Sequence, residues 1–108
     1  MDSPLVCTLT SMNIEQRERH RLVAQYLRAS IDQVRELSNG YAFRFPAESS
    51  AIMLAAEFIS AERLCCPFFT FALEVEGEQK SVWLCLTGRE GVKQFIHSEF
   101  QSWLGAIK

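Results

Sequence analysis

Three side chains able to bind a metal ion or transfer a proton lie within little more than one helical turn, in the segment Glu62-Arg-Leu-Cys65-Cys66-Pro67. Thiolates bind soft metal ions and attack electrophiles, whereas a carboxylate can bind a metal or accept a proton. Residues three and four positions apart lie on the same face of a helix. If this segment is helical, the carboxylate of Glu62 and the two thiols can therefore share one site.

The position of the cysteine pair favours metal binding over redox chemistry. Adjacent Cα atoms are only about 3.8 Å apart, below the usual disulfide range, so a Cys65–Cys66 disulfide would be strained. Redox pairs usually lie at a helix N-terminus, where the dipole lowers the thiol pKa. Pro67 places this pair at a helix C-terminus instead. A soft-metal site remains open there, because coordination itself deprotonates a thiol.

Glu62 is an unusual residue for its place on the expected helix. On a helical wheel it lies about 20° from Ala51, near the centre of the apolar face. A carboxylate there must be paired, hydrogen-bonded, protonated or bound to a metal, because leaving it charged and alone costs several kcal/mol. Arg19, Arg63 or backbone N–H groups are the structural candidates for this partner. A metal ion, or a proton shared with a cysteine thiol, is the functional candidate.

Two thiols and one carboxylate do not complete a tetrahedral zinc site, so a structural zinc ion would need another ligand. Cys7, in a short apolar stretch, is the best third thiol. In the alternating pattern of its strand, Cys85 lies on the face opposite Leu84 and Leu86. We favour the interpretation that its thiol is buried for packing alone. His20 lies among charged residues and His97 at an expected solvent edge, so neither is a strong candidate. The sequence contains no catalytic triad pattern, phosphate-binding loop or zinc-protease motif.

Hydrophobic periodicity predicts the elements that position this site. Asn13 and Gln16 can cap a first helix, and Leu22, Val23, Tyr26 and Leu27 form its apolar stripe. Asn39-Gly40 is a strong hairpin signal, because both residue types tolerate positive φ. The expected elements are an N-terminal extension or edge strand over 1–12, helices over about 14–29, 48–66 and 88–105, and hairpins over about 33–46 and 68–87.

This order, α-β-β-α-β-β-α, predicts a single α+β domain over 1–108. Two hairpins give a four-stranded antiparallel sheet, and the helices should pack mainly on one of its faces. Because each hairpin follows a helix, the pattern suggests a twofold α-β-β repeat.

Composition limits the classes of function. The chain has 108 residues, a formal net charge of −2 and 48% hydrophobic residues, enough for one domain with a real core. No excess of positive charge draws it to nucleic acid or to a membrane, and no apolar run is long enough to span one. We therefore expect a cytoplasmic protein with no nucleic-acid or membrane partner.

The chain resembles a family of small bacterial proteins with a Glu-x-x-Cys-Cys-Pro-Phe motif. The resemblance lies in the segment Glu62-Arg-Leu-Cys65-Cys66-Pro67-Phe68-Phe69, in the hairpin that follows it, and in Leu86-Thr87-Gly88-Arg89-Glu90-Gly91-Val92. The resemblance covers about 40–96. That family is largely uncharacterised and is associated with heavy-metal, particularly mercury, genes. The resemblance implies soft-metal handling, with Glu62, Cys65 and Cys66 as the matching positions. Proline is common in the family where Arg89 stands here, which changes no candidate ligand.

Three interpretations from different classes are open. The first is a binding protein for a thiophilic ion such as Hg(II), Cu(I), As(III) or Zn(II), with Cys65, Cys66 and Glu62 as ligands and Cys7 as a further candidate. The second is an interaction domain without chemistry, a homodimer that covers apolar surface at Phe68, Phe71 or Trp83. The third is a thiol enzyme with Glu62 as base and Cys65 or Cys66 as nucleophile. We expect binding rather than catalysis.

Overall fold

The computed structural model describes residues 5–6, 8–78 and 80–105. Its elements confirm the expected α+β class and order, except that the last helix is divided at Phe100. They are the 3-10 helix η1 (Leu9–Ser11), α1 (Ile14–Ser30), β1 (Gln33–Leu37), β2 (Gly40–Pro46), α2 (Ser49–Cys65), β3 (Thr70–Glu76), β4 (Ser81–Thr87), α3 (Val92–Glu99) and α4 (Gln101–Leu104). None of the described helices is long and apolar enough to cross a membrane.

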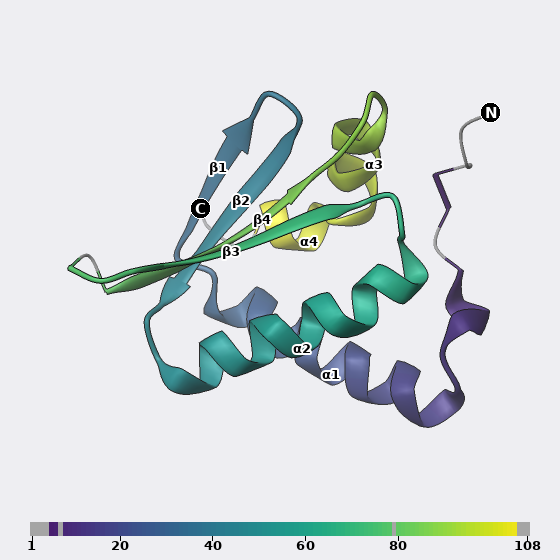
Figure 1. The fold of residues 1–108 in the computed structure, drawn as a ribbon, viewed down its shortest axis with the longest axis horizontal. Coiled ribbons are helices and arrows are strands. Elements are labelled where there is room, and N and C mark those ends of the chain that lie inside the picture. Colours follow the sequence, from purple (N-terminus) through teal and green to yellow (C-terminus); the bar gives the residue numbers. More distant parts are fainter. Residues whose placement is uncertain (1–4, 7, 79, 106–108) are drawn as a thin grey trace.

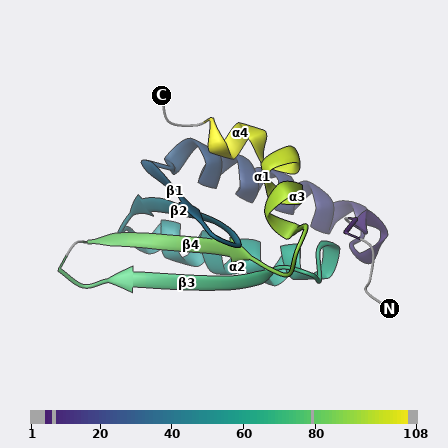
Figure 2. The same cartoon turned by 90° about the horizontal axis from the view of Figure 1, so that it is seen from above.

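The four strands form one antiparallel sheet in the order β1-β2-β4-β3. The two hairpins meet where β2 pairs with β4, and Phe43 lies opposite Leu84 in that pairing. The order is symmetric about the β2–β4 pair, as expected for two α-β-β units. The views in Figures 1 and 2 show α1 and α2 side by side against the sheet, and α3 lies close to its β2 and β4 strands.

One face of the sheet carries the core. Alternate residues of β2 and β4 point to this face and are fully buried, as the period of a strand requires: Phe43, Phe45, Val82, Leu84 and Leu86. The helices cover them with aromatic rings, since Trp103 of α4 lies 5.3 Å from Phe43 and 5.1 Å from Phe58 of α2 between ring centroids. All helices are therefore joined to the same side of the sheet through one core.

The described part of the N-terminal segment contains no strand, so the extension is found and the alternative of an edge strand is not. Instead, this segment covers the C-terminal end of α2. The backbone N–H of Thr8 donates to the carbonyl of Cys65 at 2.8 Å, and the Ser11 hydroxyl donates to the carbonyl of Leu64 at 2.9 Å. These bonds satisfy two of the carbonyls that a helix C-terminus leaves without partners.

The first hairpin forms where it was predicted, but the reason given for its glycine was wrong. Ser38 and Asn39 make the turn, and Gly40 is already the first residue of β2, paired with Leu37 and Thr87. Its φ is not in the left-handed region. Gly40 is needed because a Cβ at this position would lie 1.9 Å from the backbone oxygen of Leu86.

Candidate functional site

Glu62 lies on the buried face of α2, as the helical wheel predicts. Only 8% of the residue is exposed, and its helical neighbours on the same face, Ala55, Phe58 and Cys65, are buried with it. Burial removes the carboxylate from water, which must be compensated by a nearby polar group. Identifying this partner therefore decides what the site can do.

The compensating group is His20 of α1. Its Nε2 lies 3.3 Å from Oε1 of Glu62, and its ring stacks on Phe58 with centroids 5.1 Å apart. Neither arginine expected at this position takes the role. Arg19 forms an ion pair with Glu57 at 2.6 Å, and Arg63 is exposed.

The sequence does indicate that His20 faces the core, but the apolar stripe that we expected for α1 hid this. Val23 and Leu27 are buried, but Leu22 and Tyr26 are 48% and 42% exposed. The buried stripe therefore follows Val23 and Leu27, and His20 lies three positions before Val23 on the same side of the helix. A stripe restricted to these positions would have placed His20 in the core.

The two ring nitrogens of His20 differ in their contacts. Nδ1 is buried and has no hydrogen-bond partner among the described residues. The Nε2–H group can donate to the Glu62 carboxylate, which accepts. Nε2 is therefore the ring nitrogen through which His20 contacts the carboxylate.

Cys66 brings sulfur to the same carboxylate. Its Sγ lies 4.0 Å from Oε1 of Glu62, and its backbone N–H donates to the Glu62 carbonyl at 2.7 Å, which ends the helix. Cys66 is disulfide-bonded, whereas Cys65 and Cys85 are free thiols. Because a disulfide sulfur carries no proton, the 4.0 Å contact becomes a hydrogen bond only when Cys66 is reduced.

Cys65 is the buried free thiol beside this group. Burial raises its pKa above the ordinary value, and the negative charge of Glu62 raises it further. A hydrogen bond with Ser11 and the charge of Arg17 act in the opposite direction but are smaller effects. The thiol of Cys65 is therefore protonated at neutral pH, which makes it a weak nucleophile.

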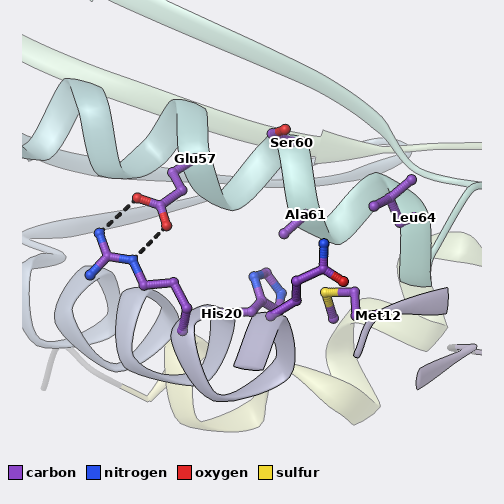
Figure 3. A pocket seen from close by; sticks show the side chains of 8 residues that line it. Met12, His20, Glu57, Ser60, Ala61 and Leu64 are labelled. Atoms are coloured by element: carbon purple, nitrogen blue, oxygen red, sulfur yellow. Dashed lines mark hydrogen bonds and ion pairs between the residues drawn. The ribbon is translucent and has the colours of Figure 1, made fainter. Parts of the chain in front are cut away.

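A pocket of about 180 Å³ opens between α1 and α2 next to the pair. In Figure 3, Ser60, Ala61 and Leu64 of α2 lie across from His20 and Met12, and the Arg19–Glu57 ion pair crosses the pocket at one end. His20 lines this pocket and also contacts Glu62. The imidazole thus connects the pocket with the buried carboxylate.

The structure brings some of the predicted site residues together and separates others. Glu62, Cys65 and Cys66 lie at one end of α2, as expected, whereas Cys85 is on the opposite face of the sheet from the helices. Cys7 lies outside the described residues. Among the residues that are described, no group of three or more His, Cys, Asp and Glu side chains is arranged to hold a metal ion. His20 and Glu62 offer two donors, and Cys66 can add a third only as a thiolate.

Comparisons of the chain with protein-family models, with curated proteins and with solved structures give no match. The site therefore has to be interpreted from its own geometry.

Proposed function

We propose that the reduced protein binds a thiophilic metal ion at the C-terminal end of α2, with Cys66, Glu62 and His20 as ligands and Cys65 as the adjacent thiol. One observation carries this proposal. The Glu62 carboxylate has its Oε1 3.3 Å from His20 Nε2 and 4.0 Å from Cys66 Sγ. One buried carboxylate oxygen thus lies near both a nitrogen and a sulfur atom.

The spacing of these atoms suits a metal ion. Bonds of about 2.0–2.3 Å in a tetrahedral site hold neighbouring ligand atoms about 3.3–3.6 Å apart. The distance between His20 and Glu62 has this value, and that between Glu62 and Cys66 exceeds it by a few tenths of an ångström. A small rotation of the Cys66 side chain would bring its sulfur within range.

The donor set also fits soft and borderline ions. Thiolates select Hg(II), Cu(I) and Zn(II), and imidazole suits zinc and copper. Binding through Nε2 of His20 requires the ring proton to move to Nδ1 or to leave, and binding through Cys66 requires loss of the thiol proton. Proton release on metal binding is therefore part of the proposal.

The proposal concerns the reduced form, because a disulfide sulfur at Cys66 offers no thiolate. A cytoplasmic location, as the sequence led us to expect, would supply the reducing conditions in which Cys66 is a thiol. Resemblance to a family associated with heavy-metal genes supports the same class of ligand.

The test is a titration of phosphine-reduced, chelator-treated protein with Hg(II) and with Zn(II), in competition with a small thiol. We expect one ion per chain, with proton release. Cys66→Ser, Glu62→Gln and His20→Gln should each weaken binding by at least about tenfold, as the loss of groups in or around a metal site does. Cys65→Ser measures whether the second thiol takes part.

Each ligand variant has a matched control elsewhere in the chain. Cys85→Ser removes a free thiol on the other face of the sheet, and His97→Gln removes an exposed imidazole. Both should bind as the wild type does. Equal, weak binding by every variant would refute the metal site and leave an interaction domain in which Glu62 and the cysteines only fix the core.

A further inference from the structure

The face of the sheet away from the helices, here called the outer face, carries Arg35 and Arg44 on one side, Trp83 and Cys85 in the middle, and Glu74 and Glu76 on the other side. Their common orientation follows from the register, in which Arg44 lies opposite Trp83 and Trp83 opposite Glu74. The core and its helices lie on the other face. Among the described elements, the outer face is therefore without a covering layer.

The charges of the outer face are separated by sign across the sheet. The arginines belong to β1 and β2, the glutamates belong to β3, and β4 between them contributes no charged side chain. Arg35 and Glu74 are exposed. Arg44 is held in an ion pair with Asp32 at 2.6 Å, so Arg35 supplies the net positive charge of one edge, and Glu74 and Glu76 make the other edge negative. The face is therefore complementary to a copy of itself in one orientation.

The outer face does not need a partner to cover Trp83, contrary to our expectation from the sequence. Trp83 is already 5% exposed, because the guanidinium of Arg35 lies 4.1 Å from its ring centroid and its Nε1–H donates to Glu76 at 2.7 Å. Phe68 is partly buried, and its ring packs against Phe69 and Phe95. Self-association through this face must therefore be argued from its charges.

We propose that two copies of the chain pack outer face against outer face about a twofold axis that runs parallel to the strands. A twofold axis along the strands exchanges the two edges of the sheet, so β3 of one copy lies over β1 of the other, and β4 lies over β2. Glu74 of each copy then lies close to Arg35 of its partner. An in-plane axis perpendicular to the strands would instead place each edge over itself, with like charges opposed.

The side chains at the centre of this face allow such packing. Ala42 and Ala72 lie on either side of Cys85, so small side chains occupy the row that crosses the axis. Aligned sheets pack about 10 Å apart, and smaller side chains permit a closer approach. The charged edges then select the orientation and the partner more than they add affinity.

Sedimentation equilibrium over a range of concentrations tests this proposal, with circular dichroism to confirm that each variant is folded. Wild type should form a dimer. Glu74→Arg and Arg35→Glu should each weaken it by about tenfold or more, and the double variant should restore it, because the charge pair is only exchanged. Glu99→Arg changes the net charge equally on the helical side and should have no effect.

Cross-linking provides a second measurement that needs no charge variant. Cys85 lies on β4, next to the axis, so a short bismaleimide should join two copies of the wild type through Cys85, and the product should disappear in Cys85→Ser. A monomer at all concentrations would overturn the proposal. So would a dimer that neither charge reversal weakens, since that result would indicate pairing through another surface, such as the β3 edge.

Discussion

His20 Nε2 and Glu62 Oε1 lie 3.3 Å apart between α1 and α2, with only 13% and 10% of the two side chains exposed. This contact joins the first helix to the helix that ends at the two adjacent cysteines. Its energy matters because a carboxylate that loses its partner in a buried position retains the full cost of desolvation. The pair is therefore a structural link as well as the centre of the proposed metal site.

A double-mutant cycle on this pair should show strong coupling. His20→Leu should lower the free energy of unfolding by about 2–4 kcal/mol, because it leaves Glu62 buried without its hydrogen bond. Glu62→Leu added to His20→Leu should recover much of this loss, since a buried polar pair can often be replaced by apolar side chains. Urea unfolding measures all four proteins.

His97→Leu is the control for this cycle, because His97 is exposed on α3 and should change stability by no more than about 0.5 kcal/mol. Additive effects of the two substitutions would show that the 3.3 Å contact contributes nothing in solution.

The sequence predicts that Glu62 is buried, but it does not predict that His20 is its partner, and the reason is physical. The burial of Glu62 follows from the period of α2 alone, because the wheel needs no knowledge of the rest of the chain. The identity of its partner depends on how α1 crosses α2. Arg19 and His20 are neighbours in sequence, and only the crossing decides that Arg19 meets Glu57 while His20 meets Glu62.

The residues that surround the cysteines could not be predicted from local sequence patterns either. Thr8 and Ser11 bind the last carbonyls of α2 from more than fifty positions away, and neither residue carries a signal for that contact. The hairpins and the helices were predictable because alternation and capping are local, as the Asn13–Gln16 capping box confirms.

Alkylation should report the electrostatic effect of Glu62 on Cys65. Burial and the charge of Glu62 raise the pKa of the Cys65 thiol, so it should react slowly with iodoacetamide at neutral pH. Glu62→Gln removes the charge but keeps the shape, and should increase the rate by lowering the pKa of Cys65. Mass spectrometry of peptides from timed samples measures the modification at each cysteine.

Cys85 serves as the internal reference in the same samples. Its thiol pKa is raised by burial and by the charge of Glu74, not of Glu62, so Glu62→Gln should leave its rate unchanged. A parallel increase at both cysteines would indicate general loosening of the fold rather than removal of a charge.

The free energy of unfolding should decrease at alkaline pH because the two free thiols, Cys65 and Cys85, lose their protons there. Burial raises the pKa of Cys65 and of Cys85, so the folded protein holds these protons more tightly than the unfolded chain does. Their contribution is complete below the ordinary thiol pKa of about 8.5 and is lost as the pH rises through the raised folded values.

Urea unfolding from neutral pH to about pH 10 tests this expectation, because the free energy of unfolding should start to fall near the ordinary thiol pKa of about 8.5. The Cys65→Ser, Cys85→Ser double variant should show a flatter profile over the same range. An unchanged slope in that variant would assign the alkaline loss to other groups, such as lysine or tyrosine.

Gly40 and Gly77 should respond in opposite ways to the same substitution. A Cβ on Gly40 would lie 1.9 Å from the backbone oxygen of Leu86, and that oxygen cannot move without disturbing the β2–β4 pairing at the centre of the sheet. Gly77, in the turn between β3 and β4, has nothing within 4 Å of an added Cβ and no positive φ. Gly40→Ala should therefore lower the free energy of unfolding by more than about 3 kcal/mol, whereas Gly77→Ala should change it by less than about 1 kcal/mol and with a stabilising sign. Thermal and urea unfolding of the two variants measure the difference. A mild effect at Gly40 would mean that β2 and β4 are further apart at this end than the structure places them.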